Sequence, residues 1–122
     1  MFKRNRRLRE TKYIRDLVRE TVLTPSDFIF PIFVVEGKNI KEEISSMPGN
    51  YHFSLDRVHE IIEDVEEAGV RGVILFGLPD HKDEVGCGAY DKNGIIQRAV
   101  KEIRAISKDL VIITDVCMCE YT

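Results

Sequence analysis

Residues 110–122 are Leu-Val-Ile-Ile-Thr-Asp-Val-Cys-Met-Cys-Glu-Tyr-Thr, an apolar β-branched run that carries an aspartate and two cysteines. Four apolar residues in a row, without alternation, are typical of a strand buried on both faces in a parallel sheet. If the chain stays extended beyond them, Asp115, Cys117 and Cys119 project from one side, because side chains alternate along a strand. A carboxylate and two thiols at the carboxyl end of a strand predict the start of a metal-binding reaction site.

Two helix-to-strand units precede this run. An apolar stripe over residues 94–107 predicts a helix, followed by a tight turn into residue 110. A second helix is predicted after Ser54, which is a favourable N-cap, and it ends at Gly69. Residues 70–76 then form a second buried strand. The short helix-to-strand turns favour parallel strands joined by helices.

The first strand is predicted at residues 28–35, interrupted at Pro31 because proline cannot donate to a ladder. Residues 36–53 and 77–94 contain glycine and proline among polar residues and are predicted to be long loops. The order of arm, strand, helix, strand, helix, strand fits an α/β fold, either a doubly wound sheet or a (β/α)8 barrel. Chemistry gathers at the carboxyl ends of the strands in both folds. The chain lacks Gly-x-Gly-x-x-Gly and Walker motifs, which weakens a nucleotide-binding interpretation.

The amino-terminal segment is basic and the remainder is acidic. Residues 1–20 carry a net charge of +5, to which Lys3 and Arg4 contribute, whereas the whole chain is at −3. Residues 1–11 lack apolar periodicity and are predicted to form an arm, and residues 12–20 a short helix. Such an arm can contact nucleic acid, an anionic membrane or another subunit. Without interleaved aromatic residues or a nucleic-acid motif, a solvated or subunit-contacting arm is favoured.

The composition indicates a soluble cytoplasmic protein. Hydrophobic residues make up 43% and charged residues 32% of the chain, and no apolar run approaches the roughly 20 residues needed to cross a bilayer. No hydrophobic signal core follows the basic residues at the amino terminus. Three cysteines, an odd number, favour reduced thiols over a disulfide framework. We therefore expect neither a membrane nor a nucleic acid as partner.

Phrases along the whole chain resemble the porphobilinogen synthase family, also called δ-aminolevulinic acid dehydratase. Each phrase alone is weak, but their order together with the terminal octapeptide is highly specific. The phrases are Arg6-Arg-Leu-Arg9, residues 17–21, Phe30-Pro-Ile-Phe-Val34, Glu36-Gly37, Ser46-Met-Pro-Gly49, Leu75-Phe-Gly-Leu-Pro79, Lys82-Asp83, Gly86, Ala89-Tyr90, Arg98-Ala99 and Asp115-Val-Cys-Met-Cys-Glu-Tyr-Thr122.

The resemblance implies the N-terminal part of a (β/α)8 TIM barrel. Residues 1–27 would be the arm with its short helix, and residues 28–122 the first three strands and two helices of an incomplete barrel. The family's arm wraps a neighbouring subunit in a homo-oligomer. The family condenses two molecules of 5-aminolevulinate into porphobilinogen, with loss of two waters, in tetrapyrrole and heme biosynthesis. The open edge of three parallel strands also predicts that the isolated chain oligomerises.

The resemblance further implies that Cys117 and Cys119 are two of three cysteine ligands of a catalytic zinc, and that Asp115 is an active-site carboxylate. Relatives that use magnesium or no metal replace these cysteines, so the sequence resembles the zinc branch. The third cysteine and the two Schiff-base lysines of the family are not among these residues. We therefore expect the isolated chain to be inactive and to bind zinc weakly, with Cys87 or a thiol of another chain completing the site.

Other interpretations of the same residues stay open. The two cysteines can be ordinary buried thiols, since free cysteine is among the most buried residue types, and Asp115 can merely cap the strand. His52, His59 and His81 are scattered singly and receive no role. Lys82, Lys92 and Lys101 are poor candidates for Schiff-base lysines. An alternative to the enzyme is a naturally short, non-catalytic metal-binding or assembly module derived from the same barrel.

Overall fold

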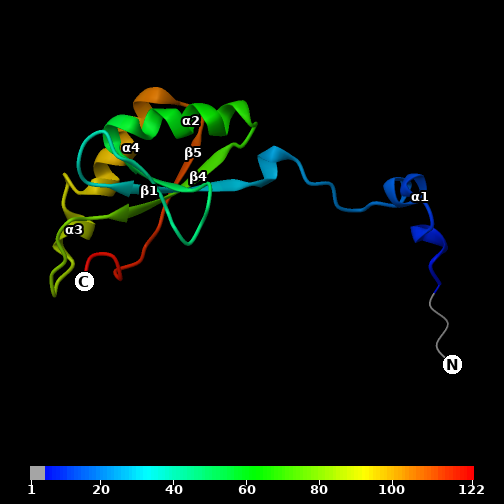
Figure 1. Ribbon diagram of the computed structural model, residues 1–122, viewed down its shortest axis with the longest axis horizontal. Coiled ribbons are helices and arrows are strands. Elements are labelled where there is room, and N and C mark those ends of the chain that lie inside the picture. The colour runs from blue at the N-terminus through cyan, green and yellow to red at the C-terminus, as the bar shows by residue number, and fades with distance from the viewer. Residues whose placement is uncertain (1–4) are drawn as a thin grey trace.

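The computed structural model describes residues 5–122, and it places one mixed sheet beside a long amino-terminal arm (Figure 1). The strands are β1 (Ile29–Val35), β2 (Lys41–Glu43), β3 (Tyr51–Ser54), β4 (Gly72–Leu78) and β5 (Val111–Thr114). The helices are α1 (Lys12–Leu17), α2 (Val58–Glu67), α3 (Cys87–Tyr90) and α4 (Ile95–Ile106), with 3-10 turns η1 (Arg7–Arg9), η2 (Pro25–Asp27) and η3 (Leu55–Arg57).

The sheet has the strand order β2-β3-β1-β4-β5. β1, β4 and β5 are parallel neighbours, and α4 connects β4 to β5. α2 and α4 both lie over one face of the sheet, as Figure 1 shows. The predicted α/β arrangement of parallel strands and covering helices is therefore confirmed.

The core lies between that face and the two helices. Alternate residues of the strands point into it, which is the period of two that a sheet with one covered face requires. Side chains from α2 and α4 that recur every three or four residues meet them. The fully buried members include Ile32, Val34, Val58, Ile62, Val73, Leu75, Ile95, Ala99 and Ile103.

The sequence predicted one long loop over residues 36–53, and this prediction is wrong. β2 and β3 form an antiparallel pair in it, and β3 also pairs in parallel with β1 through residues 33–35. Strands of three and four residues are too short for a hydrophobic period to appear in the sequence. Their pairing partners, rather than their composition, create them.

β1 runs without interruption through Pro31, contrary to the prediction. Pro31 pairs with Ile74 of β4, whereas β3 pairs with β1 only from Phe33 onward. One side of β1 is thus unpaired at Pro31, and a residue without an N–H is tolerated where no ladder bond is required.

Helix α2 ends as predicted but begins differently. The helix ends at Glu67 with Ala68 as its C-cap, and Gly69 follows in the left-handed conformation with a φ of +81°. Ser54 occupies the cap position of η3 but makes no side-chain cap bond. Its buried hydroxyl instead accepts a hydrogen bond from the backbone N–H of Ile40, at 2.8 Å. The Ser54 side chain therefore joins the end of β3 to Ile40, the residue before β2, instead of capping a helix.

The arm extends away from the sheet (Figure 1). Thr11 caps α1 by accepting a hydrogen bond from Ile14 N–H at 3.2 Å, and the helix ends at Leu17, earlier than the predicted residue 20. The side chains of Tyr13 and Leu17 are 81% and 85% exposed. Lys3 and Arg4 of the predicted basic segment lie outside the described residues. None of the helices within residues 5–122 has the length and hydropathy of a membrane-spanning segment.

Glu60 links helix α2 to β2 through two charged hydrogen bonds, and we predict that it makes stability depend on pH. Its carboxylate accepts from Arg57 at 2.7 Å and from Lys41 at 2.9 Å. These bonds, with Arg57 the larger cause, lower the pKa of Glu60 to about 2. Because the pKa is lowered on folding, the stabilisation is present above the unfolded-state value of about 4.3 and is lost as the pH falls toward 2.

Glu60→Gln should therefore reduce the urea midpoint at pH 7 and flatten its decline between pH 5 and pH 2. Glu63→Gln on the same helix is the control, because Glu63 is exposed. An unchanged acid profile in Glu60→Gln would contradict the assignment.

Candidate functional site

A row of side chains crosses the sheet at the carboxyl end of its parallel strands. Phe76 of β4 lies opposite Phe33 of β1, and Phe33 lies opposite His52 of β3. The register of β4 with β5 pairs Leu75 with Thr114, which places Asp115 beside Phe76 at the next position. The Asp115 N–H donates to the Leu75 carbonyl at 3.4 Å, so the ladder reaches this residue. Asp115 therefore ends a row that spans four strands.

The row faces away from the two covering helices. Its neighbours along the strands, such as Val34 and Leu75, are fully buried under α2 and α4. Since side chains alternate, Phe33 and Phe76 point to the opposite face. Their rings stack with centroids 5.3 Å apart, and His52 meets Phe33 edge to face at 6.2 Å. The uncovered face thus has an aromatic floor at this end.

A cavity of about 300 Å³ opens over this floor. It combines aromatic and aliphatic side chains with two carboxylates, an imidazole and a thiol. Its lining consists of Phe33, Ile44, Met47, His52, Phe76, Leu78, Asp115, Cys119 and Glu120. An apolar hollow with a few converging polar groups is the usual form of a small-molecule site.

Cys117 and Cys119 meet, but not in the way that was predicted. β5 ends at Thr114, so the extended chain does not continue to the cysteines. A turn follows, in which the N–H groups of Tyr121 and Thr122 both donate to the Met118 carbonyl. Both cysteines are exposed, and their Sγ atoms lie 2.7 Å apart. The prediction that the strand itself aligns Asp115 with the two thiols is therefore wrong, and the turn brings the thiols together.

The strand before the turn is also less buried than expected. Leu110 is buried, but Val111 is 56% exposed, and Ile112 and Ile113 are half-buried. β5 is the edge of the sheet in the strand order and has a neighbour on one side only. The expectation of burial on both faces fails here because, within residues 5–122, the helices cover only one face of the sheet and β5 lies at its edge.

The donor atoms of the two cysteines suit zinc. Thiolates are soft ligands that favour zinc over magnesium. In a tetrahedral site with Zn–S distances of about 2.3 Å, two sulfurs lie about 3.8 Å apart, so the two side chains would have to separate by about 1 Å. Their exposure leaves room for that rotation. Within residues 5–122, no three His, Cys, Asp or Glu side chains are grouped as a complete metal site.

Cys87 does not join the pair. It borders a different cavity, of about 290 Å³, together with Glu36 and Asp80. A hydrogen bond to the Asp83 carboxylate, with burial and nearby charges adding to it, raises the pKa of the Cys87 thiol. The expectation that Cys87 completes the site is not supported in the described part of the chain.

The turn that carries Cys119 rests on residues 82–88, a segment that was predicted to be loop and that includes the start of α3. Lys82 Nζ donates to the Cys119 carbonyl at 2.8 Å and lies 3.7 Å from a Glu120 carboxylate oxygen. The Asp83 N–H donates to the Tyr121 carbonyl at 3.1 Å. Neither Lys82 nor His52 was assigned a site role from the sequence. A contact across 37 residues and a strand of four residues leave no local pattern to detect.

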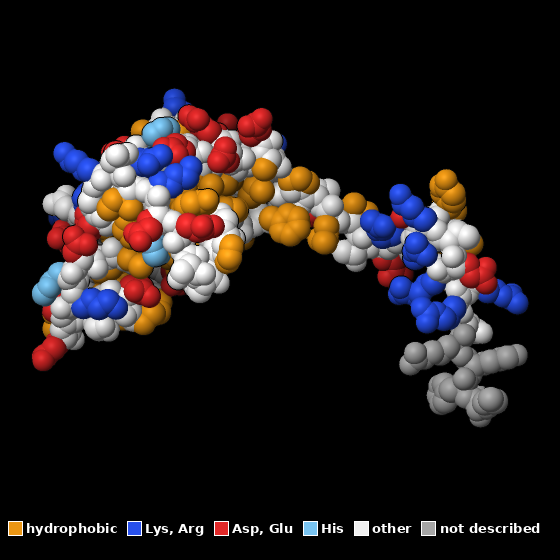
Figure 2. Space-filling model, in the orientation of Figure 1, with side chains coloured by type: hydrophobic (Ala, Val, Ile, Leu, Met, Phe, Trp, Pro, Cys, Tyr) orange, Lys and Arg blue, Asp and Glu red, His pale blue; other side chains and the backbone are white. Residues whose placement is uncertain are grey.

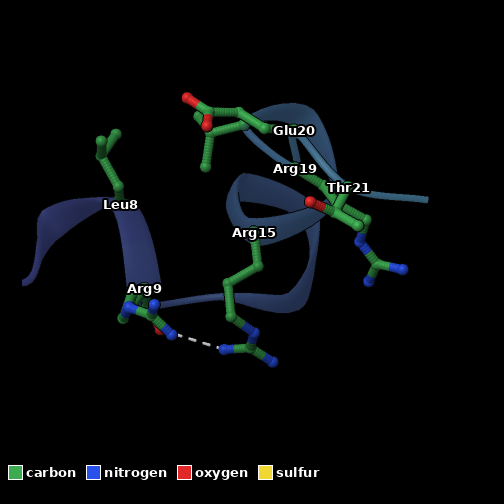
Figure 3. Close-up of a pocket in the computed structure, with 7 residues that line it drawn as sticks. Leu8, Arg9, Arg15, Arg19, Glu20 and Thr21 are labelled. Atoms are coloured by element: carbon green, nitrogen blue, oxygen red, sulfur yellow. Dashed lines mark hydrogen bonds between the residues drawn. The ribbon is translucent and has the colours of Figure 1, made fainter. Parts of the chain in front are cut away.

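A separate hollow of about 510 Å³ lies on the arm, between η1 and α1 (Figure 3). The Arg15 guanidinium donates to the Arg9 carbonyl at 3.0 Å across it. Leu8 and Arg19 also line it, and all of its lining residues belong to the arm. Because these side chains are exposed and far from the sheet, we place the candidate reaction site at the strand ends instead.

Comparison with known proteins relates the chain to one family. The family model of delta-aminolevulinic acid dehydratase matches residues 2–122. The chain is 54% identical over 122 residues to a delta-aminolevulinic acid dehydratase of Ruminiclostridium josui, and 50% identical over 121 residues to that of Staphylococcus epidermidis. These matches cover 100% and 99% of the chain but 60% and 37% of the two relatives.

A solved structure shares the fold. The crystal structure of delta-aminolevulinic acid dehydratase from Toxoplasma gondii ME49, in complex with the reaction product porphobilinogen, superposes with a TM-score of 0.90 at 27% identity. The superposition covers 100% of this chain and 35% of that one. The chain therefore spans about a third of the length of that solved structure.

We predict that Asp83 suppresses the reactivity of Cys87. Asp83→Asn keeps an acceptor oxygen for the backbone N–H groups of Val85 and Cys87 but removes the negative charge. The pKa of Cys87 should fall, and alkylation by iodoacetamide at pH 8 should become several-fold faster, because the thiolate is the reactive form. Peptide mass spectrometry separates this site from the other two cysteines.

Asp91→Asn is the matched control, since Asp91 raises the pKa of Cys87 less than Asp83 does. Equal alkylation rates in Asp83→Asn and the unchanged protein would contradict the prediction.

Proposed function

The chain belongs to the delta-aminolevulinic acid dehydratase family, and from this premise we propose that it forms the first part of a zinc-dependent porphobilinogen synthase. The reaction condenses two molecules of 5-aminolevulinate into porphobilinogen and releases two waters. The observation that carries the proposal is Asp115 at the carboxyl end of β5, bordering a cavity over an aromatic floor. Active sites of (β/α)8 enzymes lie at this end of the strands.

Cys117 and Cys119 are the proposed zinc ligands from this chain. Bound zinc would polarise a substrate carbonyl as a Lewis acid. The two thiols support this role because their sulfur atoms already converge at the turn after β5. We expect a further ligand from another part of the complete enzyme, because no third such side chain is grouped with them within residues 5–122.

Asp115 is the proposed acid–base residue. Its side chain borders both the 300 Å³ cavity, which contains Cys119, and a second one of about 230 Å³, which contains Cys117. A carboxylate at this position can hold or accept a proton of a substrate bound over Phe33 and Phe76. The apolar rings exclude water from one side of that substrate and fix its orientation.

The lysines that we considered do not supply the nucleophile. A lysine that forms a Schiff base must be desolvated so that its pKa falls, yet Lys82, Lys92 and Lys101 are all exposed. The chain also spans only 37% of the Staphylococcus epidermidis relative. We therefore expect that purified residues 1–122 form no porphobilinogen by themselves.

The arm is the proposed contact with a second subunit of a homo-oligomer. Apolar side chains along it are exposed, including Leu8, Leu17, Val22 and Leu23. Figure 2 shows basic side chains gathered on the arm and many acidic ones on the body. Apolar surface combined with this separation of charge suits docking on another copy. Three free thiols are consistent with the reducing cytoplasm as its compartment.

A chimera tests the proposed activity. Residues 1–122 would replace the matched segment of the Staphylococcus epidermidis relative, and the purified chimera would be assayed for porphobilinogen. We expect the chimera to be active. Asp115→Asn should lower kcat about 100-fold or more, the usual effect of removing an acid–base group. Cys117→Ser should lower both kcat and bound zinc.

Asp109→Asn serves as the control, because Asp109 is an exposed residue in the turn before β5. A folded chimera that makes no product would sink the proposal. If that chimera still assembled or bound zinc, the non-catalytic metal-binding or assembly module would be the better account.

A further inference from the structure

We propose that Lys82 is a positioning residue for Cys119 and that the segment 82–88 is a clasp for the turn that carries it. The inference rests on the proposed zinc role of the two cysteines. Lys82 binds the backbone carbonyl of Cys119 directly, at 2.8 Å. Its ammonium also lies 3.7 Å from the carboxylate of Glu120, the next residue. The first contact acts on the backbone of Cys119 and the second on the side chain of Glu120, so neither involves the thiol itself.

The clasp has a firm internal structure. One carboxylate oxygen of Asp83 accepts from the N–H groups of Val85 and Cys87, at 3.1 Å and 3.0 Å. The Gly86 N–H donates to the Asp83 carbonyl at 3.1 Å. These bonds close the segment on itself, so Lys82 and the Asp83 N–H are presented from a fixed loop. The Asp83 N–H then donates to the Tyr121 carbonyl, which gives the turn a second attachment.

Two glycines let the turn approach the clasp closely. Gly86 has a φ of +61°, and a Cβ at this position would collide with the terminal methyl group of Met118. A Cβ at Gly88 would lie 3.2 Å from the ring of Tyr121. The clasp therefore lies against Met118 and Tyr121, and Lys82 contacts Cys119 and Glu120, the two residues between them.

Lys82 is suited to local positioning more than to global stability. Its side chain is 48% exposed, and exposed ion pairs contribute little to the free energy of unfolding. A metal ligand, by contrast, is sensitive to its supporting contacts, whose loss typically weakens metal affinity 10- to 100-fold. Removing Lys82 should thus leave the fold intact and change the turn.

The test compares Lys82→Met, which keeps the length but loses the donor and the charge, with Lys82→Arg, which keeps both. Lys92→Met is the control, because Lys92 is an exposed lysine of the same region. Amide hydrogen exchange of Tyr121 and Thr122 is measured without metal. Zinc affinity is measured by competition with a chromophoric chelator, and cobalt substitution reports thiolate ligation by its charge-transfer absorption.

We expect Lys82→Met to speed exchange of these two amides roughly fivefold, as the loss of one hydrogen bond implies. Zinc affinity should fall about tenfold. Lys82→Arg should retain most of the slow amide exchange and most of the zinc affinity. The thermal midpoint of both variants should equal that of the unchanged protein. Equal exchange in Lys82→Met and Lys92→Met would overturn the positioning role, and faster exchange with unchanged zinc affinity would overturn its link to the metal.

A failure of the proposed zinc role can be distinguished from a failure of the positioning role of Lys82. If the unchanged protein shows no cobalt–thiolate absorption, the cysteines are not ligands in it, and the link between Lys82 and the metal is overturned with them. The exchange measurement still decides whether Lys82 holds the turn.

Discussion

β1 and β4 pair in parallel over seven residues, from Ile29 opposite Gly72 to Val35 opposite Leu78. This register decides which side chains face the helices and which face the candidate site. A slip by one residue would turn Ile32 and Val34 away from α2 and α4 and bury Phe33 in their place. The fully buried apolar residues under the two helices oppose such a slip. The position of the aromatic floor therefore follows from the packing of the opposite face.

The candidate site is built from pieces of different rigidity. Phe33 and Phe76 belong to the paired centre of the sheet, and Asp115 is attached to it by one further ladder bond. The two cysteines lie beyond the last strand, on a turn that is held by its own hydrogen bonds and by residues 82–88. A carboxylate on a rigid strand end and thiols on a separately supported turn allow the two to be oriented independently.

Membership of the delta-aminolevulinic acid dehydratase family gives this geometry a chemical meaning. The match extends over residues 2–122, and the fold superposes on a relative crystallised with porphobilinogen. The chain covers 37% of the Staphylococcus epidermidis relative, so the sheet described here is one part of the family's structure. Its exposed second face and its open edge at β5 are surfaces that a barrel uses for its interior and for its next strand.

The sequence by itself determined the α/β class, the two long helices, the three main parallel strands and the family. Each of these depends on local periodicity or on contiguous motifs, such as the apolar stripe of α4 and the octapeptide that begins at Asp115. Only the tertiary structure decided that β2 and β3 join the sheet, that β1 passes through Pro31, and that a turn brings the cysteines together. It also decided that Lys82 reaches Cys119 and that His52 borders the same cavity. The physical reason is that strand pairing and long-range hydrogen bonds depend on which segments meet in space, and short segments leave no periodic trace of such encounters in the chain.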